Sequence, residues 1–203
     1  MNYFIADTHF FHQSLLGDND FAPRPFESAA AMNAALVAAW NNRVRPQDVV
    51  YHLGDIAMNQ KPRPSDQEVL ALVTQLNGHI VWIKGNHDYT ARFKYFAAHD
   101  PGGPAASKFS FHSVGTIIKD DHTQFIMSHY PMLLGITKQT LNLHGHIHHN
   151  MVPVAENINV GVDAPERQWL ENKLPWGSPL TAREVHQLAQ AKAQWLAAQK
   201  GQA

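Results

Sequence analysis

The sequence predicts an α/β protein whose first half is built from parallel βαβ units. Short apolar runs at residues 2–6, 48–53 and 79–84 have the length and composition of buried strands. Between them, residues 28–44 and 65–76 carry helical patterns of apolar side chains. This order predicts a parallel sheet, and such sheets place functional groups in the loops just after the carboxyl ends of their strands.

The second of these helices has readable ends. Ser65 precedes an acidic stretch that includes Glu68, a spacing that predicts an N-cap with a capping box. Asn77 and Gly78 follow the last apolar residues, so we expect the helix to end there with a C-terminal cap.

After residue 105 the pattern changes to short β-like runs separated by turn residues. We expect these runs to form a second, more antiparallel sheet. They are residues 107–114, 115–120, 123–129, 141–146 and 151–162. An amphipathic helix at about 181–199 closes the chain, and the length of 203 residues predicts a single domain over residues 1–203.

Composition excludes several classes of function. The 16 basic and 17 acidic residues give no strong signal for nucleic acid or an anionic membrane surface. No apolar stretch reaches the ~20 residues that span a bilayer, and the first residues lack the features of a signal peptide, so we expect a cytoplasmic protein. With no cysteine in the sequence, any metal must be held by imidazole, carboxylate or amide groups. The oligomeric state is left open.

Metal-competent side chains follow five of the predicted strands. Taken singly, each has an ordinary explanation as a turn acid, a loop residue or one of 14 histidines. Taken together, they recur where strand ends meet, which favours a metal site. The groups are Asp7 with His9, Asp55, then Asn86 with His87 and Asp88, then His129, and finally His146 with His148.

These motifs resemble, in order, the five motifs of the calcineurin-like metallophosphoesterases, and the surrounding sequence is similar to the small single-domain bacterial and phage members. The resemblance covers roughly residues 3–163 and is carried by Asp7-x-His9, Gly54-Asp55, Gly85-Asn86-His87-Asp88, His129 and Gly145-His146-x-His148. It implies a four-layer α-β-β-α sandwich of two mixed β-sheets flanked by helices.

The resemblance also implies two divalent metal ions, with manganese favoured and iron, zinc or nickel as alternatives. Two neighbouring cations need an anion between them, which fits a bridging carboxylate. By position, Asp7, His9 and His148 resemble the ligands of one metal, and Asn86, His129 and His146 those of the other. Asp55 resembles the bridging carboxylate. If residues 146–148 are extended, both histidines of that motif lie on one side and reach neighbouring ions.

The implied reaction is the hydrolysis of a small phosphomonoester or phosphodiester, with water attacking phosphorus in line. His87 resembles the general acid that protonates the leaving oxygen, and we expect Asp88 to orient its imidazole. Arg24 and Arg92 are candidates for binding a substrate phosphate, although each could equally be a solvated loop residue. The segment at residues 10–28 is a candidate lid over the substrate.

Alternatives remain at three points. A binding or scaffold protein that kept the fold and lost turnover would normally show a damaged motif, and none is damaged here. The residues after Asp55 lack the Asp-Arg continuation of the protein serine/threonine phosphatases, which argues against a phosphoprotein substrate but does not name another. The roles of the neighbouring histidines are unassigned; these are His12, His52, His144 and His149.

Overall fold

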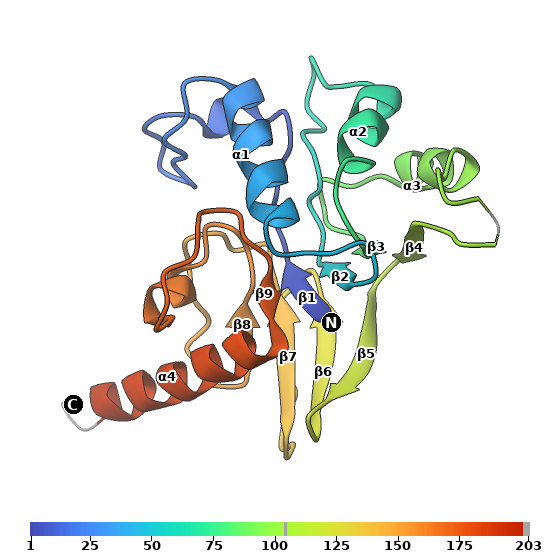
Figure 1. Cartoon of the computed structure of the whole chain (residues 1–203). Helices are drawn as coiled ribbons and strands as arrows, with labels where there is room; N and C mark the ends of the chain where they lie inside the picture. Colours follow the sequence, from blue (N-terminus) through green and yellow to red (C-terminus); the bar gives the residue numbers. More distant parts are fainter. Residues whose placement is uncertain (104, 201–203) are drawn as a thin grey trace.

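Two β-sheets lie face to face between helices in the computed structural model, which describes residues 1–103 and 105–200 (Figure 1). The layers follow the order helices, first sheet, second sheet, helix, as the sequence predicts. Among the described residues, no helix combines the length and the apolar character that a bilayer crossing requires.

The first sheet has the strand order β4-β3-β2-β1-β9. The three pairings from β1 to β4 are parallel, and the short β9 is antiparallel to β1. The strands are β1 (Asn2–Ile5), β2 (Val49–His52), β3 (His79–Ile83), β4 (Phe109–His112) and β9 (Leu180–Thr181). The predicted parallel strands are therefore confirmed, but β4 joins this sheet and not the second one.

The second sheet has the order β5-β6-β7-β8. Its strands are β5 (Gly115–Asp120), β6 (Thr123–Ser128), β7 (Thr140–His144) and β8 (Asn157–Asn159). Only the β5–β6 hairpin is antiparallel, so this sheet is mixed and the expected antiparallel character is confined to the hairpin. The connections from β6 to β7 and from β7 to β8 cross over and return, which places the carboxyl ends of all three strands at one edge.

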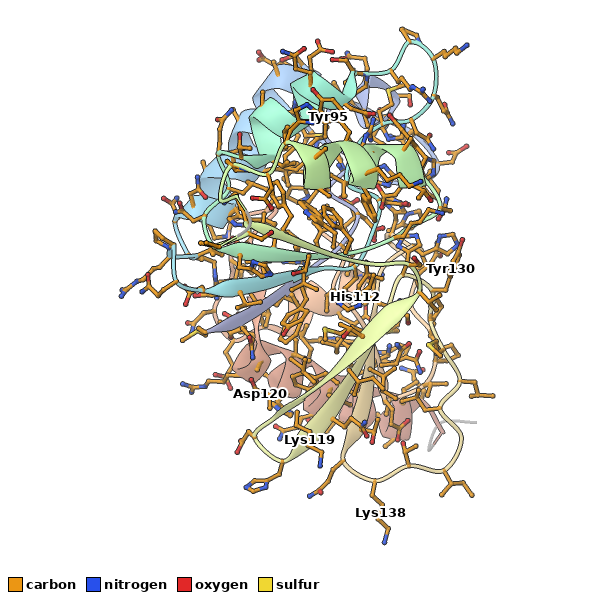
Figure 2. The ribbon with its side chains drawn as sticks, turned by 90° about the vertical axis from the view of Figure 1, so that its right-hand side faces the viewer. Tyr95, His112, Lys119, Asp120, Tyr130 and Lys138 are labelled. Atoms are coloured by element: carbon orange, nitrogen blue, oxygen red, sulfur yellow. The ribbon has the colours of Figure 1, made fainter. Side chains whose placement is uncertain are left out.

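Four α-helices of the described chain flank the sheets. Helices α1 (Ala29–Asn41), α2 (Asp66–Val73) and α3 (Thr90–Ala98) cover the outer face of the first sheet, and α4 (Ala182–Lys200) packs near β8 and β9 (Figure 1). Two short 3-10 helices, Gln13–Leu15 and Pro165–Trp169, lie in the connections. In the view of Figure 2, Lys119 and Asp120 mark the β5–β6 turn, at the end remote from α1–α3.

The capping box of α2 is present, since Ser65 accepts from the Glu68 amide and the Glu68 carboxylate accepts from Ser65. The helix nevertheless ends at Val73, four residues before the predicted cap. Gly78 has a φ of 87° and begins the approach to β3, where a side chain would meet the Asp48 carbonyl. The glycine therefore serves the turn into the strand and not the helix end.

Two apolar cores hold the layers together. One lies between the first sheet and α1–α3 and contains Ile5, Trp40 and Trp82. The other lies between the sheets and beneath α4, and it contains Phe4 and Phe125. Adjacent residues such as Phe4 and Ile5 point to opposite faces of β1, and both are buried. Because both faces of the strand are covered, its sequence is apolar from Tyr3 onward.

Candidate metal centre

The carboxyl ends of three parallel strands bring the first motifs together. Asp7 follows β1, Asp55 follows β2 and Asn86 follows β3. The Asp7 amide donates to the Gly54 carbonyl at 3.0 Å, and the His9 amide donates to the Asp55 carbonyl at 3.0 Å. These bonds continue the pairing of β1 with β2 past the strand ends, so both carboxylates lie at the same edge of the sheet.

The second sheet supplies the remaining groups from the ends of β6 and β7. The Gly145 amide donates to the His129 carbonyl at 3.0 Å, and the His146 amide donates to both carboxylate oxygens of Asp7 at 3.0 Å. A Cβ at position 145 would lie 2.7 Å from an Asp7 oxygen. Glycine at this position therefore permits the close approach of the two sheets.

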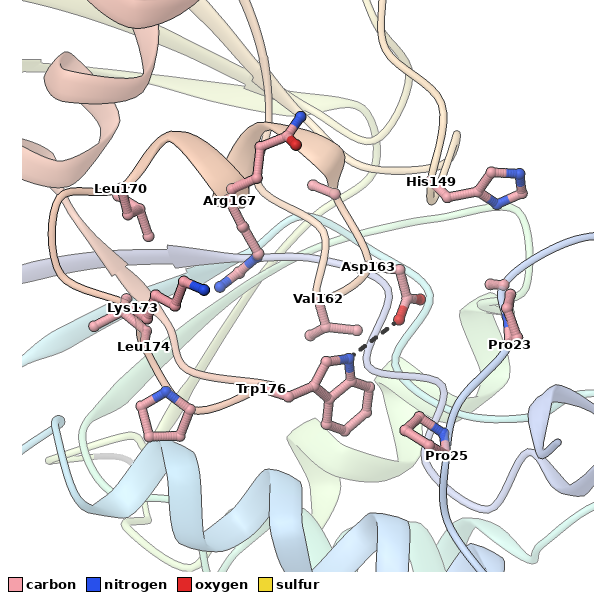
Figure 3. A pocket seen from close by; sticks show the side chains of 14 residues that line it. Pro23, Pro25, His149, Val162, Asp163, Arg167, Leu170, Lys173, Leu174 and Trp176 are labelled. Carbon is pink, nitrogen blue, oxygen red and sulfur yellow. Dashed lines mark hydrogen bonds between the residues drawn. The ribbon is translucent and has the colours of Figure 1, made fainter. Parts of the chain in front are cut away.

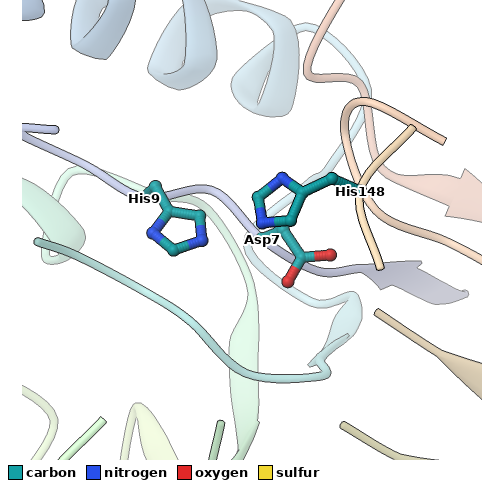
Figure 4. Close-up of side chains that lie close together, drawn as sticks. All are labelled: Asp7, His9 and His148. Carbon is teal, nitrogen blue, oxygen red and sulfur yellow. The ribbon is translucent and has the colours of Figure 1, made fainter. Parts of the chain in front are cut away.

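Asp7, His9 and His148 form the first cluster, which the structure holds together without solvent contact (Figure 4). Their ligand atoms all lie within 4.8 Å of one another, and each residue is at most 1% exposed. The His9 Nε2 atom is buried and has no hydrogen-bond partner among the described residues. A buried polar atom without a partner is costly, and a bound cation would supply one.

Asp55, Asn86, His129 and His146 form the second cluster. The Asn86 Oδ1 atom lies 2.8 Å from His129 Nε2 and 2.8 Å from His146 Nδ1. His129 is buried, whereas His146 is half-buried and Asn86 is exposed. The second cluster is therefore open on one side.

Asp55 lies between the two clusters. Its Oδ2 atom is 3.6 Å from His9 Nε2 and 3.4 Å from His129 Nε2. Its other oxygen, Oδ1, accepts from the His87 amide at 2.7 Å. One oxygen thus faces both clusters while the other is fixed by the backbone, which is the geometry that a bridging ligand needs.

Burial and charge shift the pKa values of these ligands. Burial, opposed by the nearby His148, raises the pKa of Asp7 to about 6. Burial acts to lower the pKa of His129, but its hydrogen bond to Asp55 and the charge of that carboxylate outweigh this and raise it to about 8. Burial brings the pKa of His9 well below its ordinary value. His9 is therefore neutral and able to accept a metal at neutral pH.

Left-handed backbone conformations are concentrated at the two clusters. Their φ values are 57° at Asp7, 46° at His9, 58° at Asp55, 74° at His146 and 46° at His148. The 146–148 segment follows the end of β7 as a turn, so the expectation of an extended segment is wrong. The turn itself sends the two histidines to different clusters.

Asp163 supports the first cluster, and the sequence motifs did not assign it a role. Its Oδ2 atom lies 3.1 Å from His148 Nδ1, which leaves Nε2 of that ring free to face the cluster. The same oxygen accepts from Arg24 Nη2 at 2.7 Å, and Arg24 also donates to the carbonyls of Asp7 and Thr8. Arg24 is fully buried, so the structure does not place it where a substrate could reach it.

His12 supports His9 in a similar way. Its Nδ1 atom lies 3.1 Å from His9 Nδ1, and the ring is only 6% exposed. Because burial and the neighbouring His87 lower the pKa of His12 to about 4, the neutral ring can accept from His9 Nδ1–H. That arrangement leaves the unpartnered His9 Nε2 with its lone pair directed at the cluster.

His87 lies at the open side, and its partner differs from the predicted one. Its Nδ1 atom hydrogen-bonds Asn59 Oδ1 at 3.0 Å. Asp88 instead accepts from the backbone amides of Asp55, Ile56 and Gly85 at 2.8, 3.1 and 2.9 Å. The expectation that Asp88 orients the His87 imidazole is therefore wrong, because its carboxylate is used to hold the loops that carry Asp55. Asn59 takes the predicted role.

Arg92 and the unassigned histidines His52, His144 and His149 supply no ligand atom to either cluster. Arg92 is fully buried and donates to Asp66 at 3.0 Å, so it too offers no free surface to a substrate. His52 is buried and hydrogen-bonds the Thr8 hydroxyl at 2.8 Å. His144 is buried with its Nδ1 atom 2.9 Å from the Gly145 carbonyl, whereas His149 is exposed.

A cavity of about 350 Å³ opens over the second cluster. His87, His146 and Asn86 line it, and Phe21 from the 10–28 segment closes one side. The Phe21 and His148 rings lie 4.3 Å apart. The cavity is large enough for a small ligand, and the donors beneath it are imidazole, carboxylate and amide groups, which suit manganese, iron, zinc or nickel.

Comparison with known proteins agrees with this geometry. An uncharacterized protein of Methanocaldococcus jannaschii, MJ1445, is 34% identical over 140 residues, which cover 64% of this chain and 74% of that protein. The Gene 66 protein of Mycobacterium phage L5 is 24% identical over 92% of both chains.

The fold is also found in a crystal structure of a protein of unknown function from Aquifex aeolicus, AQ665. The likeness has a TM-score of 0.62 and 23% identity, and it covers 93% of this chain and 98% of the other. The profile of the calcineurin-like phosphoesterases matches residues 3–198, nearly the whole chain. The chain therefore belongs to the calcineurin-like phosphoesterase family.

Proposed function

We propose that this protein is a phosphohydrolase that uses two divalent metal ions to cleave a small phosphomonoester or phosphodiester. The observation that carries the proposal is the position of Asp55, whose Oδ2 atom faces both His9 and His129 at 3.6 and 3.4 Å. A single carboxylate oxygen between two sets of metal-competent side chains would offset the repulsion of two adjacent cations. When bound, such ions would lower the pKa of a water molecule and offset the charge of phosphoryl oxygens.

The residues at the open side indicate where a substrate would bind. The cavity above the second cluster is bounded by Phe21, His87 and His146, and its volume of about 350 Å³ fits a small phosphorylated molecule. Because Arg24 and Arg92 are buried, recognition of the phosphoryl group would fall to the metal sites, above all to the second one, whose ligands Asn86 and His146 are exposed and half-buried.

His87 is the proposed general acid. In the cationic form of the ring, Nδ1–H donates to Asn59 Oδ1 at 3.0 Å, and Nε2–H carries the second proton, which would pass to the leaving oxygen. Nitrophenolate leaves readily without a proton, whereas an alkoxide does not. Replacing His87 should therefore slow alkyl and nucleoside esters by about 10²- to 10⁴-fold and activated nitrophenyl esters much less.

The test measures the activity ratio of the wild type to each variant against leaving-group basicity, at verified metal content. We expect a steep line for His87→Ala and a shallower one for Asn59→Ala, which leaves the ring free to rotate. Asp88→Asn is the matched control, because it disturbs the backbone amides near Asp55 and should slow every ester alike. A flat line for His87→Ala would remove its role as an acid, and loss of metal in that variant would make it a ligand.

A further inference from the structure

A second cavity, of about 560 Å³, is shown in Figure 3. It lies next to the first cluster, because Asp163 lines it and also contacts His148. Its apolar walls come from Pro23 and Pro25 on one side and from Leu174 and Trp176 on the other. Rigid rings and branched side chains of this kind bury a flat apolar group with little loss of conformational entropy. The volume lies in the range of small-molecule sites.

Two cations on the wall of this cavity lack acidic partners. Lys173 and Arg167 both line it, and neither makes an ion pair with a carboxylate within residues 1–103 and 105–200. Arg167 donates through Nε, Nη1 and Nη2 to the carbonyls of Gly161, Ser178 and Val160. A guanidinium has five N–H donors, so two remain for a ligand. In Figure 3 both side chains project toward the interior of the cavity.

Asp163, the acidic residue of this wall, does not cancel these charges. Its carboxylate is bonded to Arg24 at 2.7 Å, to His148 at 3.1 Å and to the Trp176 indole N–H at 3.3 Å. The buried guanidinium of Arg24 neutralises it, and its lone pairs are occupied. The lining therefore presents a net positive charge beside apolar rings.

The cavity is separate from the one above the metal ligands. Asp163 and His148 lie between the two, and the two cavities share no lining residue. A molecule bound here would not reach the second cluster, where the substrate is expected.

We propose that this cavity is a second ligand site, for a small planar aromatic molecule that carries a phosphate, sulfonate or carboxylate group. The ring occupies the space between the prolines and Trp176, and the anionic group contacts Lys173 and the free N–H groups of Arg167. A charge-assisted bond of this kind changes affinity by about tenfold or more.

The test is calorimetric titration of metal-free protein with naphthalene-1-sulfonate, where no hydrolysis can occur and failure of the proposed activity has no influence. We expect saturable binding of one molecule per chain, weakened about tenfold or more by Lys173→Gln. Lys138→Gln, a change in an exposed loop lysine far from the cavity, is the matched control and should bind like the wild type. Neutral naphthalene-1-sulfonamide should bind more weakly, and its affinity should be the same for Lys173→Gln and Lys138→Gln.

A second variant tests the location. Leu174→Trp fills the cavity and should abolish binding while thermal unfolding shows a folded protein. The affinity for naphthalene-1-sulfonate should also persist in manganese-loaded protein, because the ligand does not use the metal sites. Absence of saturable binding, equal affinity of Lys173→Gln and wild type, undiminished binding by folded Leu174→Trp, or loss of binding on loading with manganese would each overturn the proposal.

Discussion

The two clusters of metal-competent side chains differ in how far they are closed to solvent. The first, Asp7 with His9 and His148, is buried, and both histidines are held from behind by His12 and Asp163. The second is open, because Asn86 is exposed and His146 is half-buried. Under the proposed function, the closed cluster would hold one ion firmly and the open cluster would admit the substrate.

Replacing Asp55 should abolish the difference between the two clusters, since its Oδ2 atom faces both of them. We expect Asp55→Asn to lose metal from both sites and to lower activity by about 10³-fold or more, because the electrostatic contribution of the ions amounts to several kcal/mol. Metal content by mass spectrometry and turnover of one ester should be measured on the same sample. Two ions per chain together with normal turnover would show that Asp55 is not the bridge.

Changing Asp163 should affect the first cluster alone. Asp163→Asn weakens the support of the His148 ring, and we expect metal affinity at the first site to fall about 10- to 100-fold while the second site is unchanged. Trp176→Phe is the matched control, because it removes the bond to the other Asp163 oxygen and keeps an aromatic ring beside Arg24 and Phe26. Because Arg24 also depends on Asp163, thermal unfolding of the metal-free variants should be recorded beside the metal titrations. A parallel loss at both sites would contradict the separation.

The pH dependence of metal binding should separate the clusters as well. A protonated ligand must release its proton, so affinity rises by about tenfold per pH unit until the pH passes the ligand's pKa. Asp7 has a pKa raised to about 6 and His129 one raised to about 8. Between these values the second site should strengthen with pH while the first stays level. Titrations with buffered Mn²⁺ across this pH interval measure the affinity of both sites. Equal dependence of the two affinities on pH would count against the assignment of Asp7 to one site and His129 to the other.

The smallest effect is expected at the wall of the substrate cavity. Phe21 packs on His148 and lines the space above the second cluster. An aromatic contact of this kind is worth about 0.5–1.5 kcal/mol, so Phe21→Ala should change KM by roughly 2- to 10-fold, differently for different esters. Metal content should stay the same, and Phe21→Leu should lie between the variant and the wild type. Identical kinetics across an ester panel would reduce the 10–28 segment to a structural connection.

Local patterns were sufficient to predict the parts of the site that depend on strand ends. Asp7, Asp55 and Asn86 follow apolar runs whose parallel pairing brings their ends to one edge, so their meeting follows from the fold class. The partners of these groups depended on loop conformation. Asn59 reaches His87 across 28 positions, and Asp163 reaches Arg24 across 139. The residues next to each of these side chains in the sequence give no indication of such long-range contacts.

The limits in the fold have similar causes. The run that contains β4 has the same β character as those that follow it, and only long-range pairing with β3 assigns it to the first sheet. Helix α3 was not predicted, because its N-cap residue Tyr89 makes no side-chain cap hydrogen bond and few of its apolar residues, chiefly Phe93 and Phe96, are buried. Pairing and burial of this kind are properties of the folded chain.

The left-handed conformations of the clusters have a consequence for laboratory evolution. A non-glycine residue in this region costs about 1–2 kcal/mol, and Asp7, His9, Asp55, His146 and His148 all adopt it. Glycine or asparagine at these positions would relieve the cost. A library selected only for heat resistance in the presence of a chelator should therefore accumulate such replacements and lose the metal ligands first. Selection for stability in this chain needs metal in the medium, so that the ligands and the fold are retained together.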